Sequence, residues 1–133
     1  MKYIKLFATG GTFDKEFNEI NGNLEFQKTN LYELLELGRC KLDIKIETLM
    51  MIDSLKMSET ERSYIVEKCK KENTHKIVIT HGTDTMVETA ALLAKSIKDK
   101  TIILTGAMIP IKFGSSDGLF NLGSALSFIP VSY

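Results

Sequence analysis

The sequence predicts a doubly wound α/β domain, in which helices cover both faces of a mostly parallel sheet of the Rossmann-like or flavodoxin-like kind. Short apolar runs of strand length, such as residues 3–8 and 76–80, alternate with longer segments of helical pattern. The connections are short, and glycine-containing turns follow the strands. A length of 133 residues suits one domain, so we expect a single domain over residues 1–133.

The first strand, residues 3–8, runs into Gly10 and Gly11, where glycine lets the backbone turn sharply and approach a ligand. Residues 13–27 then mix charged and apolar side chains around the sequence Asn-Gly-Asn at 21–23. This pattern predicts a mobile β-hairpin whose turn needs a positive φ. We expect the hairpin to form a lid over Thr12.

The middle of the chain predicts a short helix, a strand and a longer helix. Asn30 is placed to cap a leucine-rich helix that ends at Gly38, where helices commonly need a left-handed residue. A strand is expected at about residues 44–50. Ser58 and Glu61 match a capping box, which predicts a helix to about residue 73.

The last third predicts the strand 76–80, a helix opened by Asp84, the strand 101–104, and a helix capped by Asp117 that reaches about Phe128. The expected apolar face of the first of these helices is Val87, Ala90, Ala91, Ala94 and Ile97. Another strand would normally follow the last helix, so we expect a truncated chain. Its uncovered Leu122, Leu126 and Phe128 predict a homo-oligomer.

Charge and composition narrow the partners. Lysine plus arginine and aspartate plus glutamate number 17 each, so the chain lacks the positive excess that favours nucleic acid or an acidic membrane surface. No apolar run is long enough to span a membrane, and no secretory signal is visible. Cys40 and Cys69 form no CxxC pair. We therefore predict a cytoplasmic protein with reduced thiols and no nucleic-acid or membrane partner.

Four turns are expected to meet at the carboxyl edge of the sheet: 10–12, 53–54, 82–84 and 106–108. Asp84 can pair with an ammonium group, while the Ser54 hydroxyl and backbone amides can receive a carboxylate. This mixture predicts a small ligand that carries both groups. The spacings of phosphate-binding loops and of a serine nucleophile elbow are missing, and the two histidines lack ligand spacing, so we predict no cofactor and no metal.

Thr12 is the remaining candidate nucleophile. A threonine hydroxyl attacks only when a neighbouring base takes its proton, so a tyrosinate, a lysine amine or a similar group must lie within hydrogen-bond reach. Glycine amides beside Thr12, that of Gly11 first, are candidates for stabilising the oxyanion of an attacked carboxamide.

Two motifs together, Ala-Thr-Gly-Gly-Thr at 8–12 and His-Gly-Thr-Asp-Thr-Met at 81–86, resemble the signature motifs of the bacterial-type L-asparaginase and glutaminase family. Gly-Ala-Met-Ile-Pro at 106–110 and Ser-Asp-Gly-Leu-Phe-Asn-Leu at 116–122 resemble two further family segments in the same order. The resemblance covers nearly the whole chain and identifies it as the amino-terminal domain of a family member.

The resemblance implies a role for each matching residue. Thr12 corresponds to the nucleophile that attacks the side-chain amide, and Thr83 to the second catalytic threonine. Asp84 corresponds to the carboxylate that binds the substrate ammonium, and Ser54 to the residue that holds the α-carboxylate. Ala107 lies where a backbone carbonyl meets the leaving amide. The implied substrate is L-asparagine, with L-glutamine the alternative, since the two differ by one methylene.

Three departures from the family pattern bear on activity. Residues 13–27 contain no tyrosine to assist Thr12, and Phe17 stands in that region. The family's catalytic lysine lies beyond the last motif of this chain, as does the carboxy-terminal domain. Leu55 stands where longer members commonly have glutamine, which is similar to the short, single-domain members.

Three functions remain open from the sequence: an asparagine amidohydrolase that works through a threonine acyl-enzyme, an inactive amino-acid-binding module of the same fold, and the amidase component of a tRNA-dependent amidotransferase. The balanced charge argues against the third. Thr12 and Thr83 could also have purely structural roles, because threonines after glycine commonly form turns and caps. We expect His81 to be a packed, hydrogen-bonded residue at a strand end and His75 to be exposed, neither of them in the site.

Overall fold

The computed structural model describes residues 3–26 and 28–129. Its central sheet has four parallel strands in the order β4-β1-β5-β6. These strands are β1 (Ile4–Gly10), β4 (Ile44–Ile52), β5 (Lys76–Thr80) and β6 (Thr101–Thr105). The parallel sheet and its strand order confirm the doubly wound α/β prediction.

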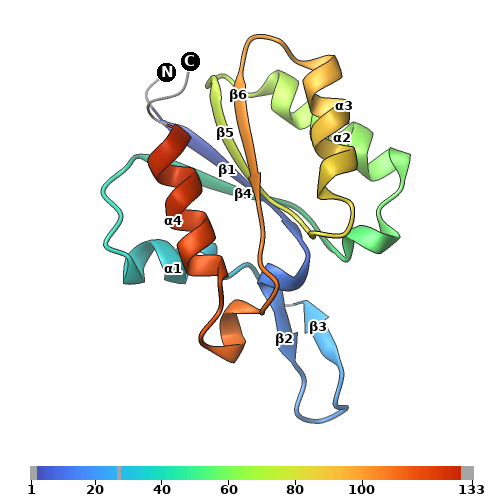
Figure 1. The fold of residues 1–133 in the computed structure, drawn as a ribbon, viewed down its shortest axis with the longest axis vertical. Helices are drawn as coiled ribbons and strands as arrows, with labels where there is room; N and C mark the ends of the chain where they lie inside the picture. The colour runs from blue at the N-terminus through green and yellow to red at the C-terminus, as the bar shows by residue number, and fades with distance from the viewer. Residues whose placement is uncertain (1–2, 27, 130–133) are drawn as a thin grey trace.

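Helices cover both faces of this sheet, as Figure 1 shows. Helices α1 (Leu31–Leu37) and α4 (Gly118–Phe128) lie on one face, and α2 (Glu59–Lys71) and α3 (Met86–Ser96) lie on the other. Each face has its own apolar core, because successive side chains of a strand point to opposite sides. In β1, Leu6 and Ala8 pack with α1 and α4, whereas Phe7 packs with α2 and α3.

The expected hairpin is present as β2 (Lys15–Phe17) paired antiparallel with β3 (Leu24–Phe26). It projects beyond the carboxyl end of the sheet in Figure 1. Gly22 in its turn has φ 75°, which confirms the predicted need for a left-handed residue. Gln27, the last residue of the expected hairpin segment, and residues 130–133 lie outside the described residues.

The end of α1 differs from the prediction. Gly38 has φ −78°, an ordinary right-handed value, and the left-handed residue is Arg39, with φ 52°. Asn30 makes no side-chain cap on α1, because its amide group binds the carboxylate of Asp14 instead. Leu37 is exposed, so the helix packs mainly through Leu31 and Leu34.

The start and the buried face of α3 also correct the prediction. The residue before the helix is Thr85, not Asp84, and Thr85 makes no side-chain cap. Val87 is 79% exposed, and Ala91 and Ala94 are exposed too. The side chains that α3 buries against the sheet are Thr89 and Leu93. Of the expected apolar face, Ile97 is buried in the same core and Ala90 is half-buried, so the prediction is confirmed only for these two positions.

The apolar residues expected to stay uncovered on α4 are mostly buried within the chain. Leu122 and Leu126 belong to the core shared by β1, α1 and α4, and Phe128 is exposed. The sequence argument for association was therefore wrong for the two leucines, since α1 covers them. The outward side chains of α4 include Leu119 and Phe120.

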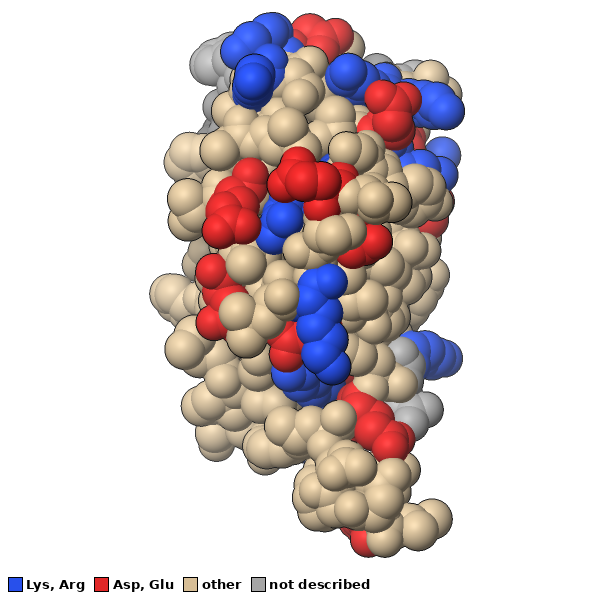
Figure 2. All heavy atoms as spheres, turned by 90° about the vertical axis from the view of Figure 1, so that its right-hand side faces the viewer, with Lys and Arg blue, Asp and Glu red and all other residues tan. Residues whose placement is uncertain are grey.

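Charged side chains of both signs are interspersed on the face shown in Figure 2.

The capping box predicted for α2 is present, because the Oε1 atom of Glu61 accepts from the backbone N–H of Ser58 at 2.7 Å. Arg62 of α2 is buried and pairs with Glu88 of α3 at 3.1 Å, which ties the two helices together. Among the described residues, no helix is long and apolar enough to cross a membrane.

Candidate active site

The candidate site lies where β1 and β5 end side by side. In a doubly wound sheet this is a topological switch point, because the chain leaves β1 toward one edge and β5 toward the other, and ligands bind in the crevice outside the carboxyl ends. The register of β1 with β4 shifts between Ala8 and Gly10, so Gly10 pairs with Ile52. The irregularity delivers Thr12 to the start of a short 3₁₀ turn, Thr12–Asp14.

Three of the four expected turns touch one another through glycine. Gly11 has φ 77°, and a Cβ atom added to it would lie 2.5 Å from the Cα of Gly82. A Cβ atom added to Gly82 would lie 2.6 Å from the Oγ of Ser54. Side chains essentially never pack this closely, so both positions need glycine. The turns of Thr12, Thr83 and Ser54 therefore meet at this contact.

The fourth turn, which follows β6, also adjoins Thr83. A Cβ atom added to Gly106 would lie 2.4 Å from the carbonyl oxygen of His81 and 3.5 Å from the Cγ2 of Thr83. The Thr83 hydroxyl also donates to the Sδ of Met108 at 3.6 Å. All four turns predicted from the sequence thus adjoin in the structure.

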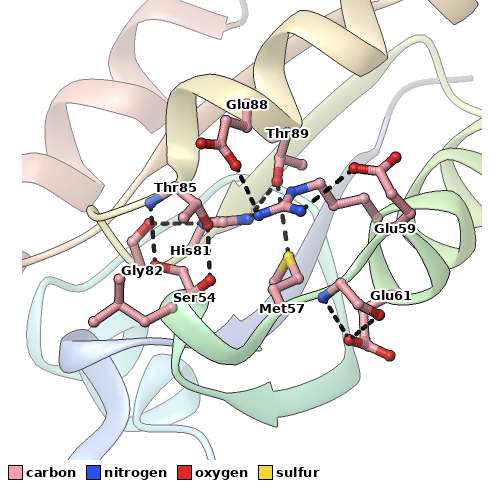
Figure 3. Close-up of polar contacts among 12 residues, drawn as sticks. Ser54, Met57, Glu59, Glu61, His81, Gly82, Thr85, Glu88 and Thr89 are labelled. Atoms are coloured by element: carbon pink, nitrogen blue, oxygen red, sulfur yellow. Dashed lines mark hydrogen bonds and ion pairs between the residues drawn. The ribbon is translucent and has the colours of Figure 1, made fainter.

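Ser54 is buried under the turn that follows β5 (Figure 3). Its Oγ accepts from the backbone N–H of Thr85 at 3.3 Å, and its carbonyl accepts from the Thr85 hydroxyl at 2.9 Å. Because this Oγ acts as the acceptor, its own O–H remains a donor. Ser54 therefore joins the turn after β4 to the turn after β5.

His81 lies behind these turns and is buried, as expected (Figure 3). Its Nδ1 lies 2.8 Å from the carbonyl oxygen of Gly82, and its Nε2 lies 2.8 Å from the Oγ1 of Thr89. A carbonyl can only accept, so Nδ1 carries the proton and Nε2 accepts from Thr89. Burial lowers the pKa of His81, which keeps the ring neutral. With both nitrogens engaged, His81 supports the turn and is not placed as a base.

Asp14, two residues after Thr12, anchors the hairpin through buried hydrogen bonds. Asp14 is fully buried, and its carboxylate accepts from the Thr29 hydroxyl at 2.8 Å and from the backbone N–H of Asn30 at 2.8 Å. Burial raises the pKa of Asp14, and these hydrogen bonds oppose the rise. Asp14 and Asn30 stand at the two ends of the hairpin segment, so the contact closes the loop beside Thr12.

Lys15 gives the hairpin a second anchor at the site. Its ammonium lies 2.9 Å from an Oδ2 of Asp53, whose Oδ1 accepts from the backbone N–H of Leu55 at 3.0 Å. Lys15 was not among the site residues predicted from the sequence. Its position three residues after Thr12 was the one available signal, since a side chain at the base of the hairpin must lie near the neighbouring turn.

The Gly11 amide, a candidate oxyanion donor, and Asp117, an expected helix cap, are placed differently from the expectation. The backbone N–H of Gly11 donates to the carbonyl of Ile52 at 2.9 Å, so this amide is engaged by β4 and is not directed at an oxyanion. Asp117 makes no cap on α4, where the Ser116 hydroxyl accepts from the N–H of Gly118 at 2.9 Å instead. Thr83 and Asp84 are exposed, and Thr12 is half-buried.

Comparison with known proteins identifies the family. The family model described as "Asparaginase, N-terminal" matches residues 3–131. This chain belongs to the asparaginase family. It is 39% identical over 132 residues to L-asparaginase 2 of Escherichia coli (strain K12). The match covers 92% of this chain and 37% of that protein. The chain thus spans about two-fifths of the length of this relative.

Other family members give the same picture. A protein of Acinetobacter glutaminasificans named glutaminase-asparaginase is 49% identical over 59 residues, which are 44% of this chain and 18% of that protein. The solved structure of a probable cytoplasmic L-asparaginase from Campylobacter jejuni superposes with a TM-score of 0.81 at 33% identity. That match covers 97% of this chain and 42% of the solved one. The family membership and the fold expected from the four motifs are therefore confirmed.

Proposed function

We propose that residues 1–133 form an amidohydrolase domain of the L-asparaginase type, which converts L-asparagine to L-aspartate and ammonia. The contact of Gly11 with Gly82 carries the proposal, because it holds the turn of Thr12 against the turn of Thr83 at the switch point of the sheet. The names of the related proteins, L-asparaginase and glutaminase-asparaginase, support an amide of a small amino acid as the substrate class.

In the proposed reaction, the Thr12 oxygen attacks the side-chain amide carbon of the substrate, and the proton of its hydroxyl passes to the leaving nitrogen. The C–N bond breaks and ammonia departs, which leaves an ester between Thr12 and the aspartyl group. Water then hydrolyses this ester and restores the hydroxyl. Thr83 orients the reacting amide, and the exposed carboxylate of Asp84 binds the substrate ammonium.

Ser54 and Ala107 complete the proposed binding site. The free O–H of Ser54 donates to the substrate α-carboxylate, which it can do because its Oγ already accepts from Thr85. The Ala107 carbonyl accepts from the leaving amide. Gly11 contributes by letting two turns approach, since its amide is engaged with Ile52. L-Glutamine is the second substrate of the same site, and the name of the Acinetobacter relative supports it.

A non-catalytic amino-acid-binding module is the second candidate, and the surroundings of Thr12 favour it. Asp14 is buried against Thr29 and Asn30, and Lys15 is paired with Asp53. The hairpin offers Phe17 in place of a tyrosine. Neither Asp14 nor Lys15 is therefore a ready acceptor for the proton of Thr12.

Release of ammonia from L-asparagine separates the two candidates. The intact chain is compared with Thr12→Ala and with Thr60→Ala, a matched control because Thr60 lies exposed in the first turn of α2. We expect Thr12→Ala to lose at least 10²-fold in rate and Thr60→Ala to keep the full rate. Equal background rates in all three proteins would end the catalytic proposal.

Calorimetry with L-aspartate tests the binding module. Heat of binding in the intact chain and in Thr12→Ala, without ammonia release, would establish the second candidate in place of the first. Absence of heat and of any thermal shift would count against the binding module.

We further propose a cytoplasmic homo-oligomer. The exposed Leu119 and Phe120 on α4 support a contact between copies, and the similar Campylobacter protein, which is named a probable cytoplasmic L-asparaginase, supports the compartment. Light scattering tests the assembly, and a strict monomer at all concentrations would contradict it.

A further inference from the structure

Asp117 lies at the start of α4, beneath the turn that follows β6. Its carboxylate accepts from the backbone N–H of Met108 and from the backbone N–H of Ile109, each at 3.0 Å. Two consecutive amides of the turn therefore point at one side chain. Hydrogen bonds to a charged acceptor are about twice as strong as neutral ones, so the carboxylate holds this stretch of backbone firmly.

Asn121, one helical turn later, strengthens the same contact. Its Nδ2 donates to the carbonyl oxygen of Gly106 at 2.9 Å and to an Oδ2 of Asp117 at 3.2 Å. The backbone on both sides of Ala107 is thus tied to the first turn of α4. Ala107 itself is buried.

The direction of the Ala107 carbonyl follows from the planarity of the peptide. The described residues contain no cis peptide bond, and in a trans peptide the C=O and the N–H point in opposite directions. The N–H of Met108 belongs to the same peptide as the C=O of Ala107. Because that N–H points at Asp117, the Ala107 carbonyl points away from α4.

Thr83 adjoins the same turn. A Cβ atom added to Gly106 would lie 3.5 Å from the Cγ2 of Thr83, and the Sδ of Met108 accepts from the Thr83 hydroxyl at 3.6 Å. Asp117 and Thr83 are therefore both neighbours of this turn. Because the Ala107 carbonyl points away from Asp117, it can face the candidate site beside Thr83.

We propose that Asp117 is a positioning residue, which aims the Ala107 carbonyl at the leaving amide of a bound carboxamide. This inference rests on the proposed function, because it takes Ala107 as the acceptor for that amide. Asp117 touches no reacting atom and acts only through the backbone. It should therefore matter for a ligand with an amide N–H and much less for the corresponding acid.

A pair of ligands tests the proposal. In a Thr12→Ala background, which prevents turnover, dissociation constants are measured by calorimetry for L-asparagine and L-aspartate, with and without Asp117→Asn. Asparagine at position 117 keeps one acceptor oxygen but loses the charge and the second acceptor oxygen, so its contacts with the two backbone amides are weaker. We expect Asp117→Asn to weaken L-asparagine about 10-fold and L-aspartate less than about 2-fold. Equal loss for both ligands, or no loss for either, would overturn the proposal.

Two further variants test whether the effect is specific to the contacts of Asp117. Asn121→Ala removes only the neighbouring donor and should act in the same direction as Asp117→Asn, by a smaller factor. Asp99→Asn is the matched control, because Asp99 is an exposed carboxylate in the turn between α3 and β6, and it should change neither constant. A change of the same kind in Asp99→Asn would contradict a specific role for Asp117.

The backbone contact is checked without any ligand. The two backbone hydrogen bonds hold the pKa of Asp117 below its ordinary value, so the amide NMR signals of Met108 and Ile109 should shift together only at strongly acidic pH. Asp117→Asn should abolish that shift. If the shift is present but neither ligand binds any variant, the proposed function fails and the role of Asp117 fails with it. If the shift is absent, the positioning fails by itself.

Discussion

The ammonium of Lys15 and the carboxylate of Asp53, 2.9 Å apart, tie the base of the hairpin to the turn that carries Ser54. The same carboxylate accepts from the N–H of Leu55 and so begins the 3₁₀ turn Ser54–Lys56. The hydrogen bond from Lys15 is the main cause that lowers the pKa of Asp53. This ion pair therefore links the hairpin, which the sequence predicts to be a lid, to the turn of Ser54, which is expected to hold the substrate α-carboxylate.

Lys15→Met should loosen the hairpin while the sheet stays intact. We expect faster hydrogen exchange at residues 15–17 and 24–26, and a loss of about 0.5–1 kcal/mol in the free energy of unfolding, since an ion pair that is only partly buried contributes little. Added salt should reduce the difference in the free energy of unfolding between Lys15→Met and the unmodified chain. Lys70→Met, at an exposed position of α2, is the control. Unchanged exchange in the hairpin would show that the ion pair does not hold it.

Gly11→Ala should cost much more stability than Gly22→Ala. Both glycines have a positive φ, 77° and 75°, so both substitutions strain the backbone by about 1–3 kcal/mol, and the ψ of −178° at Gly11 belongs to a region that essentially only glycine adopts. A Cβ atom on Gly22 meets nothing within 4 Å, whereas one on Gly11 would lie 2.5 Å from Gly82. Urea unfolding of the two variants gives the difference. Equal losses would mean that the contact between the two turns is not tight.

Asp14→Ala should be strongly destabilising, because it leaves the Thr29 hydroxyl and the Asn30 amide buried without their acceptor. The expected loss is about 2–3 kcal/mol. Asp14→Asn keeps an acceptor oxygen and should lose less. Thermal unfolding at pH 7 compares the two variants, and an equal loss in both would assign the effect to the charge.

The pH dependence of the same residue has a definite sign. The pKa of Asp14 is raised in the folded state, so its neutral form stabilises the fold below the ordinary aspartate pKa, and this stability is lost as the pH rises through the folded pKa. Asp14→Asn has no carboxylate at this position and does not lose stability in this way. The melting temperature of Asp14→Asn minus that of the unmodified chain should therefore increase as the pH rises above about 4. A constant difference from pH 3 to pH 7 would contradict the raised pKa.

Cys69 and Cys40 should differ in reactivity. Cys69 is fully buried, and burial raises its pKa to about 12, whereas Cys40 is half-buried. The thiolate is the reactive form, so at pH 8 a thiol reagent should modify one cysteine per native chain quickly and Cys69 only after unfolding. Cys40→Ser should remove the fast reaction. Fast labelling that persists in Cys40→Ser would show that Cys69 is accessible.

Local sequence signals determined the strands and the family. Apolar runs of strand length between helical segments were enough to predict a parallel sheet, and four ordered motifs were enough to identify asparaginase relatives. Gly22 shows why some turns can be predicted in detail, because a hairpin turn of this kind needs a positive φ whatever the rest of the fold does. Where a short segment alone sets the conformation, sequence is sufficient.

Tertiary structure decided which partner each polar group has. Asp84, Asp117 and Asn30 all stand where a helix cap is plausible, yet the Asp117 carboxylate binds backbone amides of the turn after β6 and the Asn30 amide binds Asp14. A cap competes with every other donor and acceptor that folding brings within reach, and those neighbours lie far away in the sequence. For the same reason, only the folded chain shows that Gly11 donates to Ile52 and that Lys15 reaches Asp53.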